Sequence, residues 1–129
     1  MLGRLVPSST SRAVVERWNS VRPTDELLAP PLLFAECTSV LSENVHRKLL
    51  PEPHARFLVE AVSRLPLRII DAPVCYPRAF DIARSLGWAK AYDALYLAAA
   101  EYEAAELLTV DRGMHDAAVR VGIQATLVR

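Results

Sequence analysis

The 129-residue chain has few cysteines, glycines and aromatic residues, and it carries no net formal charge. Its two cysteines, Cys37 and Cys75, are too few for a disulfide scaffold and too far apart for a CxxC metal site, which makes a reducing environment the default expectation. The four glycines form no glycine-rich phosphate-binding loop. Fifteen basic residues balance fifteen acidic ones. This balance excludes a surface that is basic throughout, although a local basic patch is compatible with a neutral total.

Long apolar runs are also absent. The longest one, residues 94–100, is far below the about 20 residues that a membrane-spanning helix requires, and no secretory leader pattern opens the chain. We therefore expect neither export nor a membrane anchor, and a cytoplasmic location. A hydrophobic fraction of 52% is typical of folded chains. Length and composition together predict one domain over residues 1–129.

Prolines punctuate the first part of the chain, and residues 78–129 contain none. Between prolines and glycines, helical periodicity alternates with short runs of residues that favour strands. The pattern predicts helices over residues 9–22, 31–50, 57–65, 79–86, 89–104 and 114–121. It predicts strands over residues 26–29, 67–71, 107–110 and 123–128. This alternation is typical of an α/β fold with a parallel sheet covered by helices on both faces, in which ligands bind at the carboxyl ends of the strands.

Asp93 is the most informative residue, because it interrupts an apolar helical face. The residues that share this face are all apolar: Ala89, Tyr96, Leu97 and Ala100. Burial of an isolated carboxylate costs on the order of several kcal/mol, so a cation, a metal ion or several donors would have to compensate it. The alternative is an aspartate near a helix N-terminus that accepts from free backbone N–H groups.

Three further carboxylates are candidates for the same site, although each has an alternative interpretation. Glu36 is at the edge of the apolar face of the second predicted helix, where the alternative is a rim residue that reaches solvent. Asp111 follows a predicted strand, where the alternative is an N-cap of the next helix. Asp116, one turn later, faces either the same cleft or water, and we favour water.

Glu36, Asp93 and Asp111 can converge at one edge of the sheet. Two carboxylates about 4 Å apart repel each other by about 4 kcal/mol at an effective dielectric constant of 20, so a converged cluster calls for a divalent cation. Oxygen ligands favour Mg²⁺ or Mn²⁺, and these ions suit phosphoryl chemistry.

The residues around the acidic positions each have two interpretations. Lys90 precedes Asp93 by one helical turn and Arg112 follows Asp111, so each cation either contacts a phosphate or forms a salt bridge with the acid. Three tyrosines of the apolar helix are expected to be core or dimer contacts rather than platforms for base stacking: Tyr92, Tyr96 and Tyr102.

Two segments of the chain resemble PIN-domain proteins, in particular the VapC-type ribonuclease toxins of bacterial toxin–antitoxin pairs. The C-terminal half of that family is similar to residues 91–118, AYDALYLAAAEYEAAELLTVDRGMHDAA. The region that carries the family's glutamate is similar to residues 26–41, ELLAPPLLFAECTSVL. The order of the predicted elements also matches the family along nearly the whole chain.

The resemblance implies a PIN-like three-layer α/β sandwich, with a central parallel sheet flanked by helices. It implies that Glu36, Asp93 and Asp111 are catalytic and bind the metal, with Asp116 a weaker candidate ligand. The implied cofactor is Mg²⁺ or Mn²⁺, and the implied reaction is hydrolysis of RNA phosphodiester bonds. The implied partners are a cognate antitoxin and a second copy of the chain.

The start of the chain departs from the family pattern. Family members begin with a short apolar strand that ends in an aspartate, whereas residues 1–7 here are similar to the segment after it, and no residue takes the place of that aspartate. We therefore expect an N-terminally truncated domain whose first, central strand is missing, which would leave its neighbours in the sheet without a partner.

Two alternatives to a Mg²⁺-dependent ribonuclease follow from the sequence. The first is an inactive PIN remnant that binds an antitoxin or a second copy of the chain. The second is a phosphoacceptor or nucleotide-binding α/β module. That module requires an acidic pocket with a lysine at a strand end or a glycine-rich turn, and we find neither in the sequence.

Overall fold

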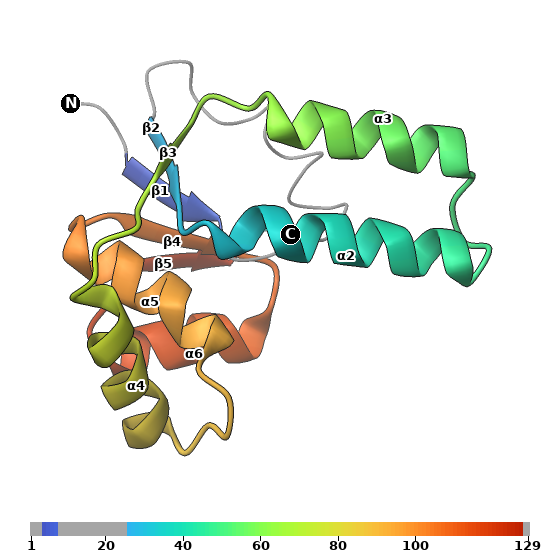
Figure 1. The fold of residues 1–129 in the computed structure, drawn as a ribbon. Coiled ribbons are helices and arrows are strands. Elements are labelled where there is room, and N and C mark those ends of the chain that lie inside the picture. The colour runs from blue at the N-terminus through green and yellow to red at the C-terminus, as the bar shows by residue number, and fades with distance from the viewer. Residues whose placement is uncertain (1–3, 8–25, 128–129) are drawn as a thin grey trace.

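The computed structural model describes residues 4–7 and 26–127, which form a parallel sheet flanked by helices (Figure 1). The strands are β1 (Arg4–Pro7), β2 (Glu26–Ala29), β3 (Leu67–Ile69), β4 (Glu106–Thr109) and β5 (Ala125–Leu127). The helices are α2 (Leu32–His46), α3 (Glu52–Ser63), α4 (Cys75–Leu86), α5 (Tyr92–Tyr102) and α6 (Arg112–Arg120). The predicted α/β class with a parallel sheet is confirmed. The helix predicted over residues 9–22 lies outside the described residues.

The five-stranded sheet that these residues form has the order β3-β2-β1-β4-β5, and every neighbouring pair is parallel. In the central strand, Leu5 is opposite Leu27 of β2 on one side and Glu106 of β4 on the other. The carboxyl ends of these strands therefore meet at one edge of the sheet. The chain passes from β2 to α2 and from β4 to α6 at this edge, which is the edge where ligands bind in open parallel sheets.

The centre of the sheet differs from the sequence prediction. We expected the central strand to be absent, but Arg4–Pro7 forms β1 between β2 and β4. The inner edges of β2 and β4 both pair with it, so their backbone groups are satisfied. Pro7 is the last residue of the strand and lies opposite Leu108 of β4. Because Ser8 follows in the sequence, the aspartate that the resemblance places at this strand end still has no counterpart.

The ends of the helices agree with the sequence prediction in α4 and differ from it in α2 and α5. α4 ends at Gly87, which adopts a φ of 72° that glycine reaches at little cost, as predicted. α2 ends at His46 rather than near residue 50, and Lys48 just beyond it has a φ of 58°. α5 begins at Tyr92 rather than at residue 89.

Among the described residues, no helix has both the length and the apolar character that a bilayer span needs.

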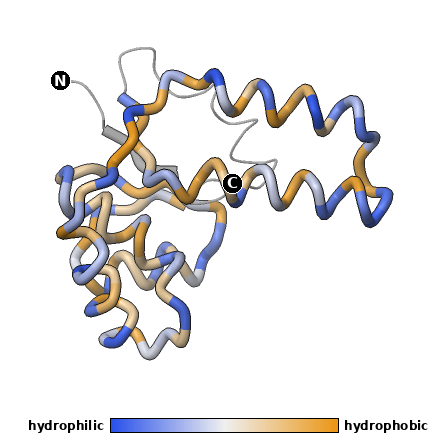
Figure 2. The backbone as a smooth tube through the Cα atoms, viewed as in Figure 1, coloured by the Kyte–Doolittle hydropathy of each residue, from blue (hydrophilic) through white to orange (hydrophobic). Residues whose placement is uncertain are grey.

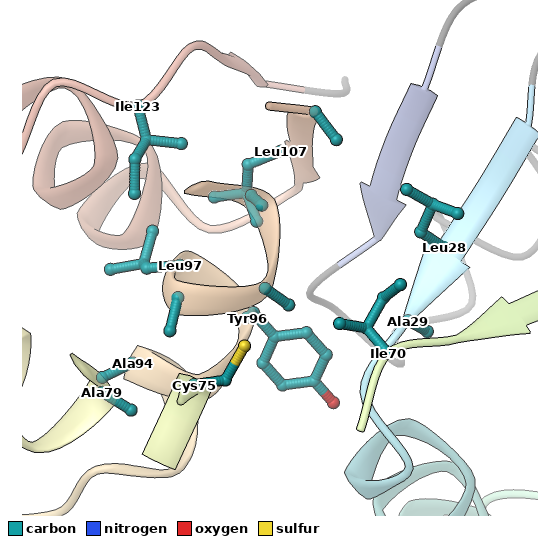
Figure 3. Close-up of a cluster of buried hydrophobic side chains, with 14 of the residues drawn as sticks. Leu28, Ala29, Ile70, Cys75, Ala79, Ala94, Tyr96, Leu97, Leu107 and Ile123 are labelled. Atoms are coloured by element: carbon teal, nitrogen blue, oxygen red, sulfur yellow. The ribbon is translucent and has the colours of Figure 1, made fainter. Parts of the chain in front are cut away.

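The core lies where α5 packs against the sheet and α4 (Figure 3). α5 contributes a nearly continuous buried run, consisting of Ala94, Tyr96, Leu97, Ala98, Ala99 and Ala100. The small alanine side chains let α4 and the sheet approach the helix closely, while Leu28, Leu107 and Ile82 fill the space around it. Full burial of each such leucine or isoleucine stabilises the fold by about 1.5–3 kcal/mol. Packing of this kind holds the N-terminal end of α5 in a defined place.

α2 and α3 form an antiparallel pair that projects from the sheet (Figure 1). α3 is amphipathic: Ala55 and Val62 are buried, whereas Phe57 is largely exposed. Hydrophilic and hydrophobic residues alternate along this pair of helices in Figure 2. The first turns of α2 lie next to the sheet, and this position brings them close to α5.

Candidate functional site

Glu36 lies in the second turn of α2, close to the end of β2. Two prolines follow Ala29 and direct the chain into the helix, with Pro31 at its start. Leu33 and Cys37 are buried on the adjoining face, so Glu36 is left half-buried at the edge of that face. This is the placement that the apolar pattern predicts.

Asp93 lies in the first turn of α5 and is exposed. The prediction that its side chain belongs to a buried face is wrong, because α5 begins at Tyr92 and Ala89 therefore lies outside the helix. The turns that follow Asp93 are buried, as the sequence indicates. Asp93 therefore lies at the exposed end of an otherwise buried helix.

Glu36 and Asp93 line the same open cleft, which has a volume of about 710 Å³. The cleft lies between α2 and the turn that joins α4 to α5. Its other described lining residues are Leu32, Ala35, Ser39, Gly87, Trp88, Ala89, Lys90 and Tyr92. The structure therefore brings together two of the four predicted acidic residues, which are far apart in the sequence, in one cavity.

The surroundings raise the pKa values of both carboxyl groups. Burial raises the pKa of Glu36 most, a hydrogen bond from Tyr96 lowers it, and the negative charge of Asp93 raises it again. Partial desolvation raises the pKa of Asp93, and the charge of Asp111 adds to this effect. Within the described part of the chain, no ion pair joins either carboxylate to a lysine or arginine. No described lysine or arginine therefore neutralises Glu36 or Asp93 by direct contact.

Tyr96 is a site residue that the sequence analysis missed. It is fully buried, and its hydroxyl donates a hydrogen bond to Oε1 of Glu36. Figure 3 shows its ring among the core side chains with the hydroxyl at the edge of the cluster. A buried tyrosine on an otherwise apolar helix needs a partner for its hydroxyl, and that requirement was the available signal. The bond links α5 to α2 and holds the Glu36 carboxylate in place.

Asp111 lies at the end of β4, as predicted, and it is the N-cap of α6. Its Oδ1 accepts from the backbone N–H of Met114 at 3.1 Å, and its own N–H donates to Oγ1 of Thr109 at 3.0 Å. A Cβ on Gly113 would lie 3.2 Å from Oδ1, so the glycine leaves room for the cap. Asp111 is exposed and does not line the cleft, although its charge acts on Asp93.

Asp116 is separate from this group. Its side chain is 69% exposed on α6, and its carboxylate pairs with Nδ1 of His115 at 3.3 Å. It is not among the residues that line the cleft. The position agrees with the interpretation that Asp116 faces water.

The donor set of the cleft can be compared with the needs of a metal ion. Among the described residues, no group of three or more His, Cys, Asp or Glu side chains is arranged to hold a metal. Mg²⁺ usually binds through one or two protein carboxylates and takes its other ligands from water and substrate phosphates. Glu36 and Asp93, with which no described lysine or arginine forms an ion pair, fit that requirement, and Asp111 is near enough to act on Asp93 by its charge.

Comparison with known proteins gave one family match and several structural matches. The family model for the PIN domain matches residues 5–120. Comparison with curated proteins gave no significant match.

The structural matches include three proteins of low identity. The structure of PAE2754 from Pyrobaculum aerophilum is 20% identical, with a TM-score of 0.62 over 90% of this chain and 86% of that one. The structure of FitAcB from Neisseria gonorrhoeae is 17% identical, with a TM-score of 0.60 over 95% of each chain. That of VapBC-1 from nontypeable Haemophilus influenzae is 13% identical, with a TM-score of 0.63 over 98% of each chain. At these identities the structural matches show a shared fold.

Proposed function

Since the chain belongs to the PIN-domain family, we propose that it is a metal-dependent endoribonuclease of the VapC toxin type, which hydrolyses RNA phosphodiester bonds. The observation that carries this proposal is the convergence of Glu36 and Asp93 on one cleft, where no described lysine or arginine forms an ion pair with either carboxylate. Structural neighbours of the toxin–antitoxin type support the same class of function.

In this proposal Glu36 and Asp93 hold Mg²⁺ or Mn²⁺, with Asp111 as a third ligand and Asp116 as a weaker candidate. A bound divalent cation supplies positive charge that stabilises the phosphoryl group during its displacement. Tyr96 keeps the Glu36 carboxylate oriented by its hydrogen bond. Lys90 lines the cleft and is available to contact a phosphate.

The proposed partners follow from the same class. A cognate antitoxin would neutralise the enzyme in the cytoplasm, as the toxin–antitoxin character of the neighbours suggests. A second copy of the chain is the other proposed partner. Co-purification with the product of an adjacent gene and measurement of the mass in solution test these two points.

The enzymatic proposal is tested by RNA cleavage with Mg²⁺, with Mn²⁺ and with a chelator. We expect cleavage only with the metal, and a loss on the order of 100- to 1,000-fold for Asp93→Asn, because this change removes a charged group from the cleft. Asp81→Asn is the matched control, since Asp81 is exposed on α4 and does not line the cleft. Cleavage that resists the chelator, or equal rates for both variants, would contradict the assignment.

One observation favours the second candidate, an inactive PIN remnant that binds an antitoxin or itself. The strand β1 ends at Pro7 and Ser8 follows, so the family's aspartate has no counterpart there. No cleavage by the full chain with either metal, together with antitoxin binding or self-association, would favour this candidate. Cleavage by the full chain would exclude it.

A further inference from the structure

The wall of the cleft next to the two carboxylates is aromatic and cationic. Trp88, Lys90 and Tyr92 all line it. Trp88 and Lys90 come from the short segment that joins α4 to α5, and Tyr92 is the first residue of α5. Tyr92 is 60% exposed, so it is not a core contact, which was one of the two expectations for it. The other expectation, a contact with a second copy of the chain, stays a prediction. Its neighbour in the chain is Asp93, one of the two acidic residues of the cleft.

Both aromatic residues adjoin the packed part of the fold. Trp88 is half-buried and packs against the core cluster, while Tyr92 begins α5, whose following turns are fully buried. The half-buried Trp88 side chain therefore has little conformational freedom left to lose when a ligand stacks on it. Gly87 and Ala89 are the other lining residues of this segment, and neither carries a side chain larger than a methyl group.

The charges of this segment suit a phosphate backbone. Lys90 is exposed, and within residues 4–7 and 26–127 it forms no ion pair. No described side chain caps the N-terminus of α5, where backbone N–H groups and the positive end of the helix dipole meet the cleft. Aromatic faces next to a cation are the combination with which proteins bind single-stranded nucleic acids.

We propose that Trp88, Lys90 and Tyr92 form a base-binding subsite for single-stranded RNA, which places the adjoining phosphate beside the cation that Glu36 and Asp93 would hold. The inference rests on the proposed ribonuclease function and specifies the substrate of the same cleft. A single strand is required because the bases of a duplex already stack on one another and present no free face.

The test measures binding in the presence of a chelator, so that metal-dependent cleavage does not interfere. Fluorescence anisotropy compares a labelled single-stranded oligouridylate with an abasic ribose-phosphate strand of the same length. We expect the full chain to bind the base-bearing strand more tightly. Tyr92→Leu should weaken that binding about 5- to 150-fold and leave the abasic strand unaffected, whereas Tyr92→Phe should preserve the preference.

Tyr102→Leu is the matched control, because Tyr102 is 55% exposed at the opposite end of the same helix. It should change neither affinity. Equal affinity of the unsubstituted chain for both strands, or an equal loss in the Tyr92→Leu and Tyr102→Leu variants, would overturn the inference. Circular dichroism verifies that each variant is folded, and the Tyr92→Phe variant keeps the ring if Tyr92→Leu perturbs α5.

Trp88 gives a second, spectroscopic readout. The chain has two tryptophans, so a Trp18→Phe variant leaves Trp88 as the only tryptophan, and excitation at the red edge of tryptophan absorption selects it over the tyrosines. Its fluorescence should be quenched by the base-bearing strand and not by the abasic one, and equal responses to both strands would overturn the role of Trp88. Failure of the proposed ribonuclease function gives another result than failure of the subsite. In that case base-dependent binding persists, but no RNA is cleaved when Mg²⁺ is added.

Discussion

The hydrogen bond from Tyr96 to Glu36 leads to a prediction whose size follows from burial. The hydroxyl of Tyr96 is enclosed in the core and donates to a carboxylate at the edge of the cleft. Hydrogen bonds to charged groups contribute about 1.5–3 kcal/mol to stability. Because Glu36 is only half-buried and water can replace part of the bond, we expect Tyr96→Phe to lower the free energy of unfolding by about 1–2 kcal/mol near neutral pH.

The loss should depend on pH in a defined direction. The hydroxyl favours the ionised carboxylate and so lowers the pKa of Glu36, against the larger effect of burial. Its contribution is therefore fully present above the pKa of Glu36 and shrinks as the pH falls through that pKa, where a neutral carboxyl forms a weaker bond of about 0.5–1.5 kcal/mol. Tyr96→Phe should thus destabilise the protein more at neutral than at acidic pH.

Urea unfolding followed by circular dichroism over a pH series measures this effect. Tyr76→Phe is the matched control, because the hydroxyl of Tyr76 also donates to a carboxylate, that of Asp71, but both groups are exposed. We expect a much smaller change for the control. Equal losses for the two variants, or a Tyr96→Phe loss that does not vary with pH, would refute the reasoning from burial and charge.

Two further predictions concern Asp111 and the cation. Asp111→Asn should keep the N-cap to Met114 and the stability while reducing Mg²⁺-dependent cleavage, whereas Asp111→Ala should lose activity and also about 1 kcal/mol of stability. Thermal unfolding and cleavage rates check this, and equal stability losses in both variants would contradict the capping role. The pKa values of Glu36 and Asp93 are raised, so the folded protein binds protons at these carboxyl groups more tightly than the unfolded chain does. Without metal, ionisation of the two groups therefore lowers the free energy of unfolding as the pH rises above the ordinary carboxyl range. Mg²⁺ binds the ionised forms, so the rise in melting temperature on adding Mg²⁺ should grow with pH, and a pH-independent rise would argue against binding at these carboxylates.

Local patterns in the sequence were sufficient for the fold class and for several individual positions. The alternation of helical and strand periodicities predicts the parallel α/β architecture, which is confirmed, because periodicity records which face of each element is buried. Gly87 ends α4 and Asp111 follows β4 as predicted, since helix ends and caps depend on the few residues around them.

Tertiary structure decided the features that depend on contacts between distant segments. Glu36 and Asp93 share a cleft because α2 and α5 meet beside the sheet, and the bond from Tyr96 to Glu36 exists only in that arrangement. The exposure of Asp93 follows from the point where α5 begins, which periodicity placed one turn too early.

The central strand β1 also depends on tertiary contacts more than on its own sequence. A run as short as Arg4–Pro7 has a weak strand signal of its own, and it is a strand because β2 and β4 on either side need backbone partners. The sequence by itself therefore determined the other four strands, the described helices and the acidic residues near their ends. The packing of α5 on the sheet determined which of those acids share a cleft, because burial of its apolar face fixes the position of its N-terminal turn.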